Sequence, residues 1–90
     1  MFRLKRSVNV PYERQGYIYF TSLRYSEMPK SKQAAVRELC RLAGGPYAAA
    51  VMEYVTTDHG AERVCQKHYL SRATLARYVA RYYEGFPDWL

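Results

Sequence analysis

Residues 65–83, CQKHYLSRATLARYVARYY, hold a row of cationic side chains that could bind a polyanion. Arg72, Arg77 and Arg81 are spaced along what the pattern predicts to be a single helix. An arginine side chain can form paired hydrogen bonds with the edge of guanine or with a phosphate group. The stretch is therefore either an amphipathic helix with solvated arginines or a helix that lies in a groove of DNA.

The outward positions of this helix favour DNA, because they are all small or basic: Ser71, Arg72, Ala73, Ala76, Arg77 and Arg81. Small residues let a helix enter a major groove that is about 12 Å wide. A generic solvated helix has no need of small residues between its arginines. We therefore expect residues 71–83 to form a recognition helix.

Such a helix needs a tight corner with the helix before it, and the apolar residues fit a helix-turn-helix. The corner is predicted to be formed by Val64, Cys65, Leu70, Leu75 and Tyr78 or Val79. Ser71 is predicted to cap the second helix, with Thr74 three residues on, and both residues are also expected to contact DNA. Tyr69 stands where this turn usually has glycine, at a left-handed backbone position.

The charge distribution agrees with a polyanion partner. The net charge is +6, and the excess lies in residues 1–25 and 61–83, on either side of a neutral middle. Lys67, Arg81 and the N-terminal Arg3, Lys5 and Arg6 are expected to contact phosphates, while Arg72 and Arg77 reach base edges.

The rest of the chain predicts a mainly α fold. Residues 1–25 alternate aromatic and β-branched residues, which predicts a basic extended arm or β-hairpin. Residues 26–90 are expected to form a helix-turn-helix domain of about four helices, with Gly44–Gly45 ending the first and Pro46 opening the second. A chain of 90 residues has a small core, so we expect a homodimer or higher homo-oligomer.

Other function classes find little support. No nucleophile–histidine arrangement or phosphate-binding glycine loop is present, so we expect no enzyme. We interpret Cys40 and Cys65 as small buried residues. His59 and His68 have no other metal-ligating residues at suitable spacing in the sequence, so no metal or other cofactor is expected. The sequence implies no small-molecule ligand, has no apolar run of membrane length and favours the cytoplasm.

Residues 48–83 also resemble the helix-turn-helix core of the PapB family, which regulates adhesin and fimbrial operons in enteric bacteria. The likeness rests on an Ala-x-x-x-Tyr-Val helix that ends near a histidine, followed by Val64-Cys65-x-Lys67-aromatic-x-Leu70. In that family too the turn lacks the usual glycine. Plasmid repressors similar to KorA are a second candidate relation, since SRATLARYV is closer to generic repressors.

The resemblance implies an oligomeric bacterial transcription regulator, and the residues themselves predict a protein that binds double-stranded DNA in a sequence-specific way. Two alternatives remain open. The basic, tyrosine-rich arm could bind RNA or single-stranded DNA by stacking, or the basic surface could belong to a non-catalytic adaptor that binds an acidic protein.

Overall fold

The computed structural model describes Lys5 and residues 8–90, and this part of the chain is helical without strands. Its α-helices are α1 (Tyr12–Leu23), α2 (Lys30–Gly44), α3 (Ala48–Thr56), α4 (Ala61–His68) and α5 (Arg72–Gly85). Short 3₁₀ turns, η1 (Tyr25–Glu27) and η2 (Gly45–Tyr47), lead into α2 and α3. The predictions of a mainly α fold, and of four α-helices within residues 26–90, are confirmed.

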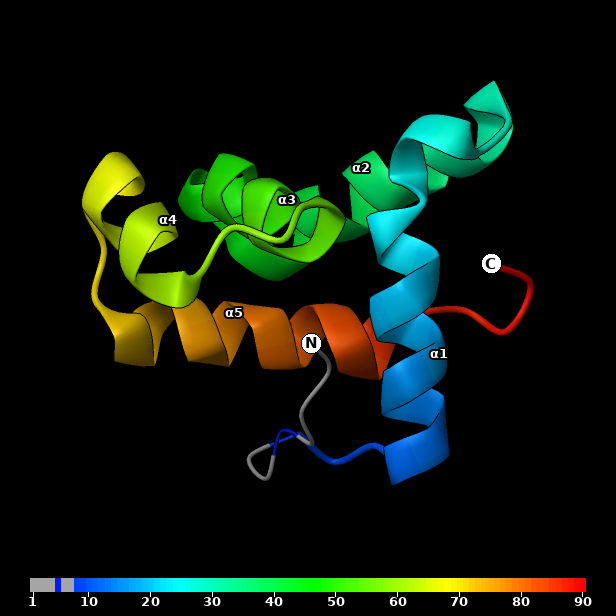
Figure 1. Cartoon of the computed structure of the whole chain (residues 1–90), viewed down its shortest axis with the longest axis horizontal. Helices are drawn as coiled ribbons and strands as arrows, with labels where there is room; N and C mark the ends of the chain where they lie inside the picture. Colours follow the sequence, from blue (N-terminus) through cyan, green and yellow to red (C-terminus); the bar gives the residue numbers. More distant parts are fainter. Residues whose placement is uncertain (1–4, 6–7) are drawn as a thin grey trace.

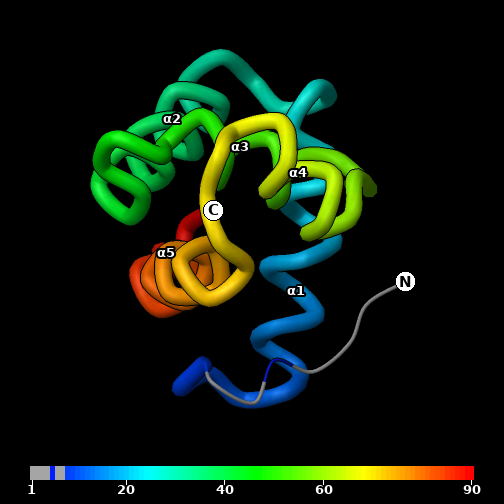
Figure 2. Tube along the Cα trace, turned by 90° about the vertical axis from the view of Figure 1, so that its left-hand side faces the viewer, coloured from blue at the N-terminus to red at the C-terminus, as the bar shows by residue number. Residues whose placement is uncertain are grey.

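The helices pack around a single core, and α5 forms one side of it. In Figure 1, α5 runs along one side, α2, α3 and α4 lie across it, and α1 crosses near its C-terminal end. Figure 2 looks along α5 and shows α2 and α3 on the same side of it, with α1 beside them. The buried apolar residues come from every α-helix and from the C-terminal tail, and include Ile18, Val36, Val51, Val64, Leu75, Tyr82 and Leu90.

The prediction of a β-hairpin in residues 1–25 is wrong for residues 12–23, which form α1. The buried residues of this helix are Gln15, Ile18 and Ser22, at spacings of three and four that only a helix places on one face. The alternating aromatic pattern indicated a strand, but β propensity reflects packing more than backbone preference, and here the packing partner is a helix. Since Ile18 is fully buried, residues 12–23 belong to the core and do not form an arm.

Gln15 holds the chain that precedes α1. Its side-chain amide accepts a hydrogen bond from the Lys5 backbone N–H at 2.8 Å and donates to the Lys5 carbonyl at 3.1 Å and the Val10 carbonyl at 2.9 Å. Val8 is buried, and the Asn9 N–H donates to Glu84 on α5 at 3.2 Å. Lys5 and Val10 are therefore fastened to α1, and Asn9 is fastened to α5.

The ends of α2 and α3 follow the predicted signals only in part. Gly45 ends α2 with φ +53, where glycine is the residue best tolerated, and Pro46 stands at the start of η2 instead of α3. The N-caps of α2 and α4 are Pro29 and Gly60, and neither helix has a side-chain cap hydrogen bond. None of the helices in the described part of the chain is both long and apolar enough to cross a membrane.

Candidate nucleic-acid interface

The turn between α4 and α5 has the backbone of a helix-turn-helix corner. Tyr69 has φ 58 and ψ 52, in the left-handed region where glycine was expected. The N–H groups of Tyr69 and Leu70 both donate to the carbonyl of Cys65, the second at 3.2 Å, which closes the last turn of α4 as a Schellman motif. The Tyr69 side chain is 89% exposed, so the residue is not kept there by packing.

The predicted apolar residues form the inside of this corner. Val64, Cys65, Leu75 and Val79 are buried. Leu70, expected to be a buried anchor, is only partly buried, although it packs against the core. The α4–α5 corner is therefore held by the residues that the sequence indicated.

Tyr78 supports α5 from its other side. It is half-buried, and its ring stacks on Tyr47 with the ring centroids 5.9 Å apart. This contact fixes the middle of α5 against η2.

Ser71 and Thr74 form the predicted cap. The Ser71 Oγ accepts a hydrogen bond from the Thr74 N–H at 3.1 Å and donates to Thr74 Oγ1 at 2.9 Å. The cap fixes the start of α5. It also uses hydrogen-bonding groups of Ser71 and Thr74, two residues that were expected to contact DNA.

The outer face of α5 has the predicted small and basic character. Arg72, Ala73, Ala76, Arg77 and Arg81 are all exposed. A hollow of about 540 Å³ follows this face, lined by Ala73, Ala76, Arg77, Ala80, Arg81 and Glu84. The alanines leave space between the arginine side chains, as a helix that enters a groove requires.

Within the described residues, the arginines of α5 have no ion-pair partner, whereas several others do. Arg14 pairs with Asp88 at 3.2 Å, Arg24 with Glu27 at 3.7 Å and Arg41 with Glu38 at 2.6 Å. Arg81 lies over the ring of Tyr78, 5.3 Å from its centroid, which orients the side chain without neutralising it. The three arginines of α5 therefore carry positive charge that no carboxylate in the described part of the chain neutralises.

Lys67, which was predicted to contact phosphate, already forms an ion pair within the protein. Its side chain is 62% exposed, and its Nζ lies 3.1 Å from Oε1 of Glu53 on α3. Glu53 also accepts hydrogen bonds from His59 Nδ1 at 2.8 Å and from His68 Nε2 at 2.9 Å. Because an ionised carboxylate can only accept hydrogen bonds, His59 Nδ1 and His68 Nε2 must each carry a hydrogen.

The Glu53 cluster ties α3 to the end of α4 and to the loop between them. The hydrogen bonds from His68 and His59 lower the pKa of Glu53 to about 2, from an ordinary value of 4.5. The sequence reasoning missed this cluster. Its only signal is a single acid among the apolar residues of AAAVMEYV, followed by histidines 6 and 15 residues later.

The N-terminal cations predicted to reach phosphates divide into two groups. Lys5 is half-buried and turns inward, with its Nζ 3.3 Å from the hydroxyl of Tyr54 and 5.6 Å from the ring centroid of Tyr83. Arg3 and Arg6 lie outside the described residues. Of the predicted arm cations, the structure therefore places only Lys5, and it places the Lys5 ammonium group between Tyr54 and Tyr83.

The cysteines and histidines form no metal site in the part of the chain that the structure describes. Cys40 and Cys65 are both buried free thiols, as expected, and burial raises the pKa of Cys40 to about 12. Cys40 donates to the sulfur of Met52 at 3.7 Å, an ordinary core contact.

No family model, no curated protein and no solved structure matches this chain. The resemblance of residues 48–83 to the PapB family thus remains a prediction.

Proposed function

We propose that the protein is a sequence-specific regulator that binds double-stranded DNA, with residues 71–83 of α5 in the major groove. The observation that carries this proposal is the outer face of α5, where exposed arginines without ion-pair partners alternate with alanines on a helix fixed by a capped corner. Arginine is suited to guanine and to phosphate, and alanine permits close approach. Catalysis plays no part in this role.

The charges along α5 indicate which part of the helix faces DNA. Arg77 lines the outer hollow and is positioned to read base edges, and Arg81 is positioned for phosphates. Glu84 lies at the far end of the same hollow and would be repelled by phosphates. We therefore place the contact on the first three turns of α5, with Arg72 at its start.

The likeness to the PapB family supports this proposal and extends it. It would make the protein a cytoplasmic bacterial regulator, for example a repressor of a fimbrial or plasmid operon, that acts as a homo-oligomer. Arg3 and Arg6 would add phosphate contacts from the N-terminal segment.

The proposal is tested by titrating the chain with random duplex DNA at low salt, followed by selection from a duplex pool read by sequencing. We expect binding that weakens steeply with salt and a selected sequence that binds more tightly than random duplex. An absence of duplex binding at low salt would reject the proposal and favour an adaptor for an acidic protein. Tighter binding to RNA or single strands would favour the stacking alternative.

A further inference from the structure

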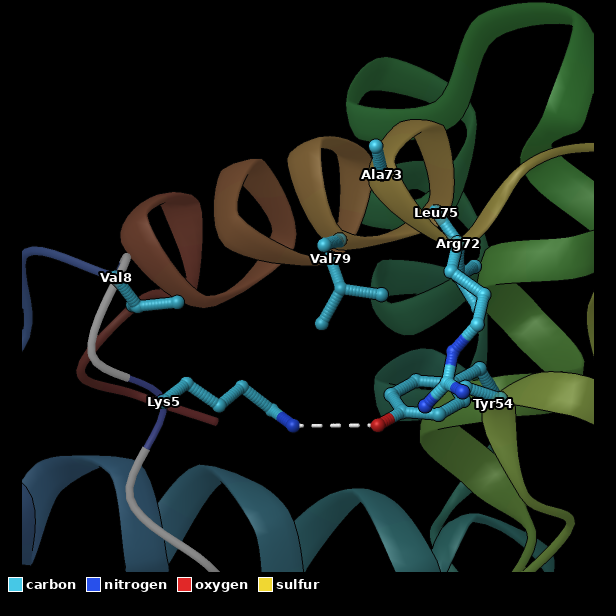
Figure 3. Close-up of a pocket in the computed structure, with 9 residues that line it drawn as sticks. Lys5, Val8, Tyr54, Arg72, Ala73, Leu75 and Val79 are labelled. Atoms are coloured by element: carbon cyan, nitrogen blue, oxygen red, sulfur yellow. Dashed lines mark hydrogen bonds between the residues drawn. The ribbon is translucent and has the colours of Figure 1, made fainter.

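A cavity of about 450 Å³ lies alongside α5, between this helix, α3, the start of α4 and the residues Lys5 and Val8 that precede α1. Its apolar wall consists of Val8, Ala61, Ala73, Leu75, Ala76 and Val79. Figure 3 shows how Lys5 reaches in from the N-terminal segment and Arg72 from the start of α5, toward Tyr54 of α3. The volume and the mostly apolar lining are typical of sites that enclose a small organic molecule.

The charged and polar side chains that line this cavity favour an anionic ligand. Lys5 and Arg72 both line it, and no acidic residue is among its described lining residues. Neither cation has a carboxylate partner elsewhere in the described chain, so both charges are available to a ligand.

The hydroxyl of Tyr54 adds a donor. Lys5 can only donate, so in their 3.3 Å contact the Tyr54 oxygen is the acceptor. The Tyr54 O–H is then left to donate, and no other hydrogen bond of this hydroxyl is seen in the described residues. An ammonium, a guanidinium and a hydroxyl donor thus face an apolar wall.

We propose that this cavity binds a small organic acid, with one carboxylate held by Lys5, Arg72 and Tyr54 and an aromatic or branched hydrocarbon body against Val79 and Leu75. No sequence pattern predicts such a ligand, because Lys5, Tyr54 and Arg72 meet only in the folded chain. A carboxylate fits because the donors converge on one end of the cavity while the rest of it is apolar.

A bound acid would also change the DNA-binding face. Arg72 opens α5, and a ligand that holds its guanidinium in the cavity removes one cation from the DNA contact. This consequence rests on the proposed function, whereas binding of the acid does not. By reciprocal coupling, duplex DNA would weaken binding of the acid by the same factor.

The test uses phenylacetate as the probe and uncharged phenylacetamide as its matched control, each titrated into the full chain without DNA and followed by amide chemical shifts and calorimetry. We expect saturable binding of phenylacetate, with shifts centred on residues 54, 72, 76 and 79, and binding of the amide weaker by about tenfold or more. Equal binding of acid and amide, or no saturable binding of phenylacetate, would overturn the proposal.

Three variants locate the site. Lys5→Ala should weaken phenylacetate binding about tenfold, whereas Arg63→Ala, which removes one exposed cation of α4 away from the cavity, should leave it unchanged. Ala61→Phe should block the cavity while the far-ultraviolet circular dichroism stays that of the wild type. If Ala61→Phe does not fold, Tyr54→Phe, which removes only the hydroxyl, should still weaken binding severalfold. Equal losses in Lys5→Ala and Arg63→Ala would show nonspecific charge attraction and reject the site.

The coupling is measured on the same variants with duplex DNA. Phenylacetate should lower the duplex affinity of the wild-type chain and leave that of Ala61→Phe unchanged. Acid binding together with no duplex binding would reject the proposed function and keep the acid site. Acid binding with an unchanged duplex affinity would reject only the coupling.

Discussion

Arg72 and Arg77 are both exposed on α5, but they point in different directions and line different hollows. Arg72 lines the inner cavity with Lys5 and Tyr54, whereas Arg77 lines the outer hollow with the alanines. A residue that reads a base must project away from its own core. Of the two, Arg77 is therefore the stronger candidate for direct reading of sequence.

Replacement of Arg77 by alanine should reduce the affinity for a selected duplex by about 1–3 kcal/mol and abolish the preference at one base pair. The physical reason is the loss of a paired contact to a base edge. The measurement is fluorescence anisotropy with selected and random duplexes. Arg41→Ala serves as the control, because Arg41 is an exposed arginine on α2 that already pairs with Glu38. Equal losses on both duplexes would instead assign Arg77 to phosphate.

At the scale of elements, the α4–α5 turn depends on an unfavourable residue. Tyr69 adopts φ 58 with an exposed ring, so the left-handed backbone costs about 1–2 kcal/mol that side-chain packing does not offset. Such a cost is tolerated where the surrounding hydrogen bonds, here those to the Cys65 carbonyl, fix the backbone.

Tyr69→Gly should therefore stabilise the fold by up to about 1 kcal/mol relative to Tyr69→Ala, because glycine adopts this backbone conformation freely. Alanine is the matched control, since it removes the same ring but keeps the Cβ. Chemical denaturation of both variants measures the difference. A glycine variant less stable than the alanine variant would show that the turn relaxes when the ring is removed.

The Glu53 cluster makes the α3–α4 contact sensitive to acid. The pKa of Glu53 is about 2 in the folded chain against an ordinary 4.5, so the folded state favours the carboxylate. A lowered pKa contributes stability that is complete above pH 4.5 and is lost as the pH falls from 4.5 toward 2.

Glu53→Gln should destabilise the protein at neutral pH by about 1.5–3 kcal/mol, the usual worth of hydrogen bonds to a charged group. It should also remove the acid-dependent loss between pH 4.5 and 2 that the wild type shows. Thermal unfolding across this pH range measures both effects. Glu38→Gln is the control, because Glu38 is exposed and pairs only with Arg41 on its own helix. An unchanged acid limb in Glu53→Gln would contradict the assignment.

At the scale of the whole molecule, the longest-range hydrogen bond of the buried core joins α1 to α5. Ser22 Oγ and Tyr82 Oη lie 2.8 Å apart, and both residues are buried. Burial also raises the pKa of Tyr82, so its hydroxyl remains protonated. The contact explains why α1 is part of the core.

Ser22→Ala should cost about 1–3 kcal/mol, because it leaves the buried Tyr82 hydroxyl without a partner. Tyr82→Phe is the complementary change, and the double variant should be less destabilised than the sum of the two. A coupling free energy of about 0.5–3 kcal/mol, obtained from denaturant unfolding of all four proteins, is the expected result. Additive losses would mean that water satisfies each hydroxyl in the single variants.

The size of the molecule is compatible with DNA half-sites one helical turn apart. Its extents are 31 × 26 × 22 Å, so two copies fit side by side on half-sites separated by one turn of DNA, roughly 34 Å. If the protein binds DNA as a dimer, the selected sequence should be a near-palindrome with half-sites centred about 10 base pairs apart. Pool selection, together with light scattering of the free and bound chain, measures both properties. A single short selected site bound by one chain would contradict the dimer.

A feature of this structure could be predicted from the sequence when the residues that form it lie close together along the chain. The corner was predictable because Val64, Cys65 and Leu75 lie within a few turns of one another and the N-cap pair Ser71 and Thr74 is local. Helix α1 was not, since its aromatic alternation imitates a strand and its packing partners are distant in the sequence, as Tyr82 is from Ser22. The same holds for the site: the face of α5 was visible in the sequence, but the inward turn of Lys5 was not.

The bond between Ser22 and Tyr82 has a consequence for the order of synthesis. A ribosome releases residues 12–23 long before residues 75–90, yet Ile18 and Ser22 are buried against a core that includes Leu75, Tyr82, Phe86 and Leu90. The core that covers Ile18 and Ser22 is therefore incomplete until α5 has emerged. We infer that the chain reaches its final packing only after α5 leaves the exit tunnel, and that until then the face of α1 that carries Ile18 is open to chaperones.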